Sequence, residues 1–384
     1  MPQAVVASNV DRVPEQLNLL VSHGAAACFA PEHGSEQPAS ALLVSRTERP
    51  VSTLYRYQVQ VGNRQYRVLA KQYRKWRLSI EGNDRDIHMN PPRLFAPPTL
   101  EDKAPFEHVA LQAIQEHFAT LKDARFGAVR PLAVSPNERA IVMEELPEPS
   151  LSKQLLACHR LAHRRQVSQW VNLARLVGAW LREFHQLPDL PHTRVRHAQR
   201  DDFVSSIRAA VVYLTAALGQ ASRFEHVYDR MAAAAAKELP AQLPLGLNHA
   251  DFTPRNVLVG QDARVSVIDT LGRWRAPIYE DMGGFLVAVE TTELQMYSLG
   301  WLLPSKVIRS FKEAFVHGYF GDDAPPLQRV RLFEAQSLLY KWVSMTHGAR
   351  QTAGIKRWAK RGRLAVRNHF ITAYLQRVME ELAA

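Results

Sequence analysis

The sequence predicts an α+β fold in which strands occupy the N-terminal part and helices most of the C-terminal part. Three observations lead to this prediction: an alternating hairpin over residues 54–71, two stretches with apolar side chains at helical spacing (106–118 and 167–184), and a second hairpin over 257–268. The chain has 384 residues, 46% of them hydrophobic, so it can bury a large core and is expected to divide into two domains or lobes.

Residues 1–45 are expected to form a mixed N-terminal leader. A helix is predicted at Pro14–His23, and Ala30–Ser40 reads as a linker. An N-terminal lobe then covers 46–146, and a helical lobe covers 147–384.

The first hairpin is predicted from alternation and from its turn. Tyr55, Tyr57, Val59 and Val61 alternate with polar residues, and Gly62-Asn63 supplies the turn. The second strand ends in V-L-A-K at Lys71. A lysine at a strand end is usually a solvated charge, so this position needs support from its surroundings.

The segment 73–105 contains five prolines and little periodicity, which predicts a long loop. The helix that follows, around residues 106–118, carries Glu107 near its start and Glu116 near its end. Residues 140–147 then read as an apolar strand that runs into a proline, and the amphipathic helix at 167–184 stops before Pro188.

The second hairpin carries the most informative polar groups. His249, Asp251 and Asn256 have the spacing H-x-D-x-x-x-x-N, and Asp269 ends the following strand. An amide oxygen at Asn256 and a carboxylate at Asp269 suit Mg²⁺, which prefers oxygen ligands. Asp251 can orient a hydroxyl group and take its proton. His249 is expected to brace the loop, as a lone histidine usually does.

These residues together resemble the aminoglycoside phosphotransferase and choline kinase family, whose fold is similar to that of protein kinases. The resemblance implies a two-lobed fold with an antiparallel sheet lobe and a helical lobe, and the cofactors ATP or GTP with Mg²⁺. It implies that Lys71 binds phosphate and pairs with Glu107, with Glu116 as the alternative. A hinge at Met143, Glu144, Glu145 and Leu146 would bind the purine, and Asp281 would anchor helices.

The sequence also departs from the family pattern. Ala250 stands where glycine is common, and no glycine-rich loop precedes Tyr55. Ser52 and Thr53 lie near where such a loop would be and could offer donors to phosphate. Too few residues separate Asp269 from Asp281 for the activation segment of a protein kinase, which disfavours a protein substrate.

The net charge of +11 favours an acceptor that is neutral or anionic over a polycationic one, with a sugar or saccharide as a candidate. Arg273, Trp274 and Arg275 are candidate acceptor contacts, with closure of the lobe as the alternative. A basic segment at 356–367 suggests either a solvated helix face or peripheral contact with an anionic membrane surface. No recognisable nucleic-acid module is present, so nucleic acid is not an expected partner.

Two cysteines, Cys28 and Cys158, form no framework and fit a reducing compartment. No secretion signal or membrane span is recognisable, so the protein is expected to be cytoplasmic. His159 and His163 lack an acidic neighbour and make a poor metal site. The sequence therefore favours a small-molecule kinase, and the alternative is a catalytically silent relative that binds nucleotide.

Overall fold

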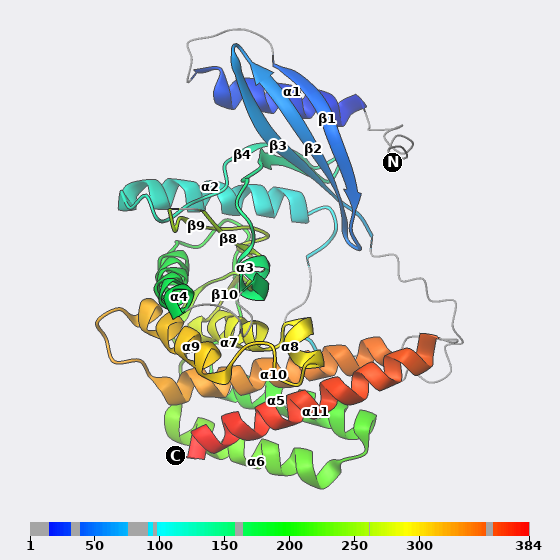
Figure 1. Cartoon of the computed structure of the whole chain (residues 1–384), viewed down its shortest axis with the longest axis vertical. Helices are drawn as coiled ribbons and strands as arrows, with labels where there is room; N and C mark the ends of the chain where they lie inside the picture. Colours follow the sequence, from blue (N-terminus) through cyan, green and yellow to red (C-terminus); the bar gives the residue numbers. More distant parts are fainter. Residues whose placement is uncertain are drawn as a thin grey trace. The chain divides into compact units, whose positions relative to one another are not determined.

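The computed structural model describes residues 15–31, 39–75, 91–94, 98–157, 164–260, 262–350 and 356–383. Cys158, His159 and His163 lie outside these ranges. The chain divides into two compact units (Figure 1). Unit 1 comprises Met1–Leu78, Pro97–Glu148 and Ser266–Gly272, and unit 2 comprises Ser79–Ala96, Pro149–Val265 and Arg273–Ala384.

Unit 1 contains a five-stranded antiparallel sheet with the strand order β1-β2-β3-β5-β4. Its strands are β1 (Ser40–Glu48), β2 (Ser52–Val61), β3 (Arg64–Tyr73), β4 (Pro131–Ser135) and β5 (Ala140–Glu144). The hairpin predicted from alternation is β2–β3. Its two-residue turn has Gly62 at a φ of 56°, a left-handed conformation that glycine adopts at little cost.

The two faces of this sheet carry different helices. Helix α1 (Glu15–Phe29) packs through Leu17, Val21 and Phe29 against a face that includes Val68 and Ala70 of β3. Since side chains alternate along a strand, Lys71 and Tyr73 point to the opposite face. There they meet Glu107 of α2 (Lys103–Leu121).

The N-terminal elements extend beyond what the sequence indicated. The helix expected at Pro14–His23 continues to Phe29, and β1 occupies Ser40–Glu48, where the sequence suggested a linker and the end of a leader. Both elements contribute to the core of unit 1, since Ala41 and Leu43 of β1 pack against the buried cluster that includes Phe29.

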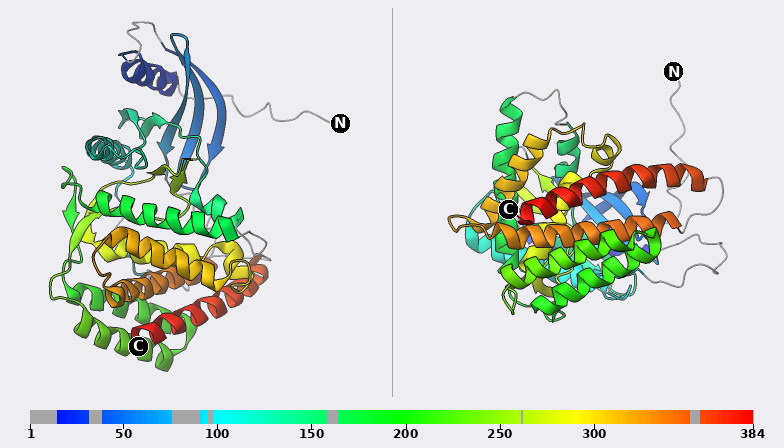
Figure 2. Two further views of the ribbon diagram at one scale, coloured as in Figure 1. Left: turned by 60° about the vertical axis from the view of Figure 1, so that its left-hand side comes forward. Right: turned by 90° about the horizontal axis from the view of Figure 1, so that it is seen from below.

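Unit 2 is mostly helical (Figure 2). Its helices are α3 (Leu151–Ala157), α4 (Arg164–His185), α5 (Arg200–Leu218), α6 (Ala221–Glu238), α7 (Ile278–Glu290), α8 (Glu293–Tyr297), α9 (Ser305–Phe320), α10 (Leu327–Arg350) and α11 (Lys356–Ala383). The strands β6 (Arg194–Val195), β10 (Trp274–Pro277) and β7 (Leu245–Asn248) form a small sheet in that order. Strand β8 (Val257–Val259) pairs with β9 (Val265–Val267), and the boundary between the units falls after Val265, within β9. The α+β prediction is confirmed.

Close packing of α4 and α9 builds the core of unit 2. A Cβ atom on Gly178 would lie 2.0 Å from the carbonyl oxygen of Phe315, and one on Gly318 would lie 2.0 Å from that of Arg175. Both helices therefore need glycine at the contact. Trp180 of α4 and Phe315 of α9 lie within an aromatic cluster that also holds Phe252.

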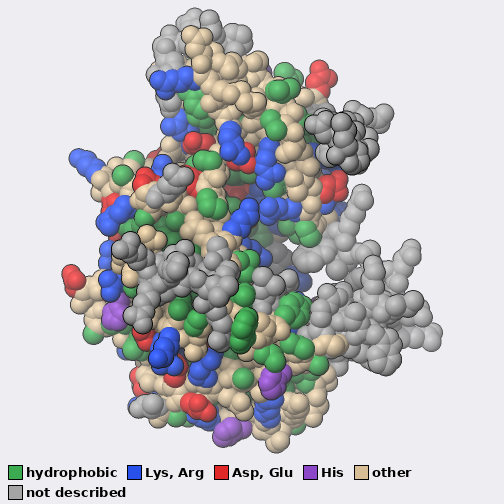
Figure 3. Space-filling view, viewed as in Figure 1, with side chains coloured by type: hydrophobic (Ala, Val, Ile, Leu, Met, Phe, Trp, Pro, Cys, Tyr) green, Lys and Arg blue, Asp and Glu red, His purple; other side chains and the backbone are tan. Residues whose placement is uncertain are grey.

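No helix in the described ranges is long and apolar enough to cross a membrane. On the face drawn in Figure 3, Lys and Arg side chains are distributed over both units. Of the basic residues in the segment 356–367, Arg367 is one whose side chain the structure describes, and its guanidinium stacks over Tyr297 at 5.1 Å.

A buried ionic network joins four helices of unit 2. Glu334 of α10 accepts hydrogen bonds from Lys312 of α9, from Tyr374 of α11 at 2.5 Å and from Arg331 at 2.7 Å. Lys312 also reaches Glu290 of α7 at 3.0 Å. Burial alone would raise the pKa of Glu334, but the cations Lys312 and Arg331 outweigh burial and lower it to about 2.

This network predicts a defined acid sensitivity. The folded pKa of Glu334 lies below its ordinary value of 4.5, so its contribution to stability is present above pH 4.5 and is lost as the pH falls towards about 2. The loss is on the order of 3 kcal/mol. The Tm of wild type should therefore fall as the pH is lowered over this range. In Glu334→Gln the Tm should depend less on pH. The exposed variant Glu225→Gln should retain the wild-type dependence; equal pH profiles for wild type and Glu334→Gln would contradict the assignment.

Candidate active site

The loop that carries His249, Asp251 and Asn256 begins in a turn. Asp281, on α7, binds the backbone of this turn. Strand β7 ends at Asn248, and the backbone N–H groups of His249 and Ala250 donate to the two carboxylate oxygens of Asp281 at 2.6 and 3.0 Å. Ala250 has a φ of +66°, a left-handed conformation that costs a residue with a Cβ about 1–2 kcal/mol. This explains why glycine would suit position 250.

Asp281 is buried but remains an anion. Its carboxylate lies 3.2 Å from Nε2 of His185, whose Nδ1 lies 2.7 Å from the hydroxyl of Tyr319. Burial alone would raise the pKa of Asp281. The hydrogen bond from His185, the two nearby histidines and the backbone of His249 outweigh burial and hold that pKa below its ordinary value.

His249 and Phe252 fasten the loop to the core. The N–H of Asp251 donates to Nδ1 of His249 at 3.4 Å, which places the ring proton on Nε2. The His249 ring contacts Phe184 of α4 and Phe252, both at 5.7 Å between ring centroids. The residue is 2% exposed, so its ring lies in the core of unit 2.

The carboxylate of Asp251 projects from this loop and is held by two donors. Arg255 Nη2 lies 2.9 and 2.7 Å from its two oxygens, and Asn256 Nδ2 donates to one of them at 3.0 Å. The same amide nitrogen donates to the backbone carbonyl of Asp251 at 2.9 Å. Because Asn256 uses its nitrogen on Asp251, its amide oxygen points elsewhere and remains an acceptor.

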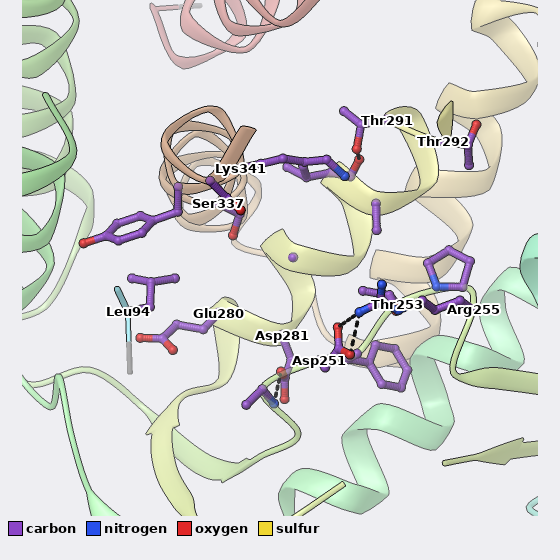
Figure 4. A pocket seen from close by; sticks show the side chains of 18 of the residues that line it. Leu94, Asp251, Thr253, Arg255, Glu280, Asp281, Thr291, Thr292, Ser337 and Lys341 are labelled. Atoms are coloured by element: carbon purple, nitrogen blue, oxygen red, sulfur yellow. Dashed lines mark hydrogen bonds and ion pairs between the residues drawn. The ribbon is translucent and has the colours of Figure 1, made fainter. Parts of the chain in front are cut away.

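Asp251 lines a pocket of about 830 Å³ that lies wholly within unit 2 (Figure 4). A volume of this size suits a small molecule. The walls come from the loop that starts at β7, from α3, α7 and α10, and from Leu94, whose carbonyl accepts a hydrogen bond from Arg196 at 2.9 Å. The long proline-rich loop after β3 therefore contributes to the wall of this pocket.

Unit 1 holds a separate charged centre around Lys71. Its ammonium lies 2.9 and 3.1 Å from the carboxylate oxygens of Glu107 and 2.5 Å from Asp269. Tyr73 donates to Glu107 at 2.6 Å. Glu107 and not Glu116 is therefore the ion-pair partner of Lys71. Lys71 is therefore shared between two carboxylates, Glu107 and Asp269.

The protonation states of this centre follow from burial and charge. Burial would lower the pKa of Lys71, but Glu107, Tyr73 and Asp269 outweigh it and raise that pKa well above its ordinary value. Burial raises the pKa of Glu107, and Lys71 offsets this rise only in part. The lysine therefore stays charged at neutral pH, which a phosphate-binding role requires.

The segment expected to form a hinge ends β5. Met143 is 4% exposed, so its side chain lies in the core. The N–H of Glu144 donates to the carbonyl of Arg130, and the N–H of Glu145 donates to that of Arg67, both at 2.9 Å. The Glu145 carboxylate binds Arg56 at 2.6 Å. Leu146 follows directly after these paired residues.

The turn between β1 and β2 consists of Arg49, Pro50 and Val51. It contains no glycine, and Pro50 has no N–H to offer an anion. Ser52 and Thr53 are buried at the start of β2, with 3% and 5% exposed. They belong to a strand and not to a phosphate-binding loop.

Arg273, Trp274 and Arg275 are not among the residues that line the pocket. Arg275 instead forms an ion pair with Asp189 and donates to the carbonyl of Leu187 at 2.8 Å. The guanidinium groups of Arg196 and Arg273 stack over Trp274 at 5.7 and 4.8 Å. These contacts hold Trp274 and Arg275 against neighbouring parts of unit 2.

Sequence reasoning missed two residues of the charged centre. Tyr73 lies two residues after Lys71 on the same strand, so period-two alternation places it on the same face. Lys103, whose ammonium stacks over Tyr73 at 5.5 Å, precedes Glu107 by four residues on one helix face. Burial, and to a lesser extent Lys71, lower the pKa of Lys103.

Asn256 and Asp269 fit Mg²⁺ by their chemistry. Asn256 presents an amide oxygen because its nitrogen is bound to Asp251, and the carboxylate of Asp269 is 37% exposed. No group of three or more acidic, His or Cys side chains suited to a metal occurs in the described part of the chain.

Comparison with known proteins gave a family match over most of the chain. Residues 56–328 match the phosphotransferase enzyme family. Similar solved structures include an ethanolamine kinase of Plasmodium vivax, with 12% identity, 98% of this chain and 92% of that chain covered, and a TM-score of 0.48.

A macrolide 2'-phosphotransferase of Brachybacterium faecium has 15% identity, with 91% and 98% covered and a TM-score of 0.49. A choline kinase of Streptococcus pneumoniae has 11% identity, with 87% and 94% covered and a TM-score of 0.42. No curated protein matches the chain significantly. We rest the family assignment on the sequence match alone.

The left-handed residue in the turn generates a stability prediction. Ala250→Gly should raise the free energy of unfolding by up to about 1 kcal/mol, because glycine removes the strain of a positive φ. Ala250→Val should lower it by roughly 2 kcal/mol or more. Thermal unfolding measures both. The control Ala233→Gly, in helix α6, should lower stability by about 1 kcal/mol. If Ala250→Gly and Ala250→Val were equally stable, the turn would not be strained.

Proposed function

Because the chain belongs to the phosphotransferase enzyme family, we propose that it transfers the γ-phosphate of ATP or GTP to a hydroxyl group of a small molecule, with a sugar or saccharide as the acceptor class. The observation that carries the proposal is the placement of Asp251. Its carboxylate lines a pocket of about 830 Å³ and is oriented by Arg255 and Asn256.

Asp251 is proposed as the general base. It accepts a hydrogen bond from the acceptor hydroxyl and takes its proton as the hydroxyl oxygen bonds to the γ-phosphorus. The bond from that phosphorus to the β–γ bridging oxygen breaks, and the nucleoside diphosphate leaves. Arg255 holds both oxygens of Asp251, so the base keeps a fixed direction before the acceptor arrives.

Lys71 is proposed to bind the α- and β-phosphates, with Glu107 holding its ammonium in place. Asn256 and Asp269 are the residues we assign to Mg²⁺, which when bound supplies positive charge to the phosphate oxygens. We assign the purine contacts to the backbone carbonyl of Glu144 and the N–H of Leu146, because the N–H groups of Glu144 and Glu145 are already bonded to Arg130 and Arg67.

The alternative is a catalytically silent relative that binds nucleotide or acts as a scaffold. The feature that favours it is the β1–β2 turn, where Pro50 replaces the backbone N–H donors that a glycine-rich loop would offer. The presence of Asp251, Asn256 and Asp269 together favours catalysis over this alternative.

Replacement of the base separates these two functions. Asp251→Asn should lower phosphotransfer by about 10²–10⁴-fold, because the amide cannot take the proton. The measurement is nucleoside diphosphate release with Mg²⁺ and a panel of hydroxyl acceptors. Asp123→Asn breaks another aspartate–arginine pair, with Arg125, and should leave the rate unchanged. A loss of less than tenfold in Asp251→Asn would exclude Asp251 as the general base. Nucleotide binding without turnover in wild type would support the catalytically silent form.

The metal assignment predicts a change in magnesium dependence. Asp269→Asn should raise the Mg²⁺ concentration needed for half-maximal turnover at least about tenfold, a loss of the size seen when groups around metal sites are altered. The exposed variant Asp262→Asn, seven residues earlier, is the control. Chelation of Mg²⁺ should abolish turnover in both proteins. An unaltered magnesium requirement in Asp269→Asn would rule out Asp269 as a ligand.

A further inference from the structure

The side chain of Asn248 is buried without hydrogen bonds of its own. Asn248 ends β7, and its side chain is 2% exposed. Its backbone pairs with Trp274 of β10, yet neither Oδ1 nor Nδ2 has a partner among the described residues. Buried polar groups without partners are rare in folded proteins, and each costs about 1–3 kcal/mol. Such a residue calls for a reason other than stability.

Asn248 lines the same pocket as Asp251. Two more polar groups in the lining are also buried without a hydrogen-bond partner among the described residues. The hydroxyl groups of Thr253 and Thr292 line the pocket and have no hydrogen-bond partner within the described ranges. The neighbouring Thr291 differs, because its hydroxyl donates to the carbonyl of Val287 at 2.5 Å. The unsatisfied groups therefore come from three places: the end of β7, the loop after it, and the segment after α7.

The charged groups that line the pocket balance one another. The three cationic residues are Arg196, Arg255 and Lys341, and the three acidic residues are Asp251, Glu280 and Asp281. Each of the three carboxylates is already bound: Asp251 by Arg255, Glu280 by Arg196 and His197, and Asp281 by His185 and two backbone N–H groups. The described lining therefore carries no surplus of carboxylates over cations that would attract an ammonium group.

We infer that this pocket takes a neutral polyhydroxylated acceptor and that Asn248 is a specificity-determining residue for it. The amide oxygen of Asn248 accepts a hydrogen bond from one hydroxyl, and its nitrogen donates to the oxygen of the adjacent hydroxyl. The hydroxyl groups of Thr253 and Thr292 serve further hydroxyls of the same molecule. This inference rests on the proposed function, because it describes the acceptor of that reaction.

A matched set of saccharides tests the inference. The probes are neutral hexoses and disaccharides, the amino sugar of each, and the deoxy sugar that lacks one of two adjacent hydroxyls; choline is a compact cationic probe. With Mg²⁺ and ATP or GTP, wild type should turn over a neutral parent at least tenfold more efficiently than its amino counterpart. A site built to bind a hydroxyl rejects an analogue that lacks it, so the deoxy sugar should also be poor.

Two variants at position 248 separate recognition from folding. Asn248→Leu should raise the KM of the neutral acceptor at least tenfold and remove the difference between parent and deoxy sugar, while its Tm stays at or above that of wild type. Asn248→Asp has nearly the same shape and should shift the preference towards the amino sugar. Thr346 is equally buried and unsatisfied but does not line the pocket, so Thr346→Val should keep the wild-type KM.

The outcomes distinguish failure of the acceptor assignment from failure of the proposed phosphotransfer. Preference of wild type for an amino sugar or for choline would overturn the acceptor assignment while leaving phosphotransfer intact. The same holds if Asn248→Leu lowers Tm but retains the wild-type KM and the wild-type response to the deoxy sugar, since Asn248 would then be structural. Nucleotide binding without turnover on any acceptor would overturn the proposed function and this inference together.

Discussion

The arrangement of the site in unit 2 depends on one buried carboxylate. Asp281 receives the backbone N–H groups of His249 and Ala250, and His185 holds it from α4. These bonds offset the cost of the left-handed backbone at Ala250. The turn directs Asp251 into the pocket and leaves Asn248 on the pocket wall just before it. A single anion on α7 therefore sets the geometry of both the proposed base and the proposed acceptor contact.

The proposed nucleotide-binding centre of unit 1 is built from buried ion pairs. Lys71 binds two carboxylates, Glu107 and Asp269, in a buried setting where unpaired charge would be costly. We propose a metal–nucleotide complex as the partner of this centre and a neutral acceptor as the partner of the pocket in unit 2.

Local patterns explain which elements the sequence could predict. The β2–β3 hairpin and α2 have clear periods, and the residues of H-x-D-x-x-x-x-N share one turn, so their spacing fixes their proximity. Strand β1 was missed because Leu42 and Val44, which face outward and are 66% and 60% exposed, are as apolar as the residues that face the core. The pocket wall could not be predicted, since Arg196 and Glu280 meet across 84 residues without a local signal.

The stereochemistry of transfer tests the central claim most directly, because it reports whether Asp251 acts as a base on the acceptor or is itself phosphorylated. The measurement uses a nucleotide whose γ-phosphate is made chiral with oxygen isotopes, followed by determination of the configuration at phosphorus in the product. A single in-line displacement by the acceptor hydroxyl predicts inversion. Retention of configuration would require a phosphorylated protein intermediate and would contradict the role we propose for Asp251.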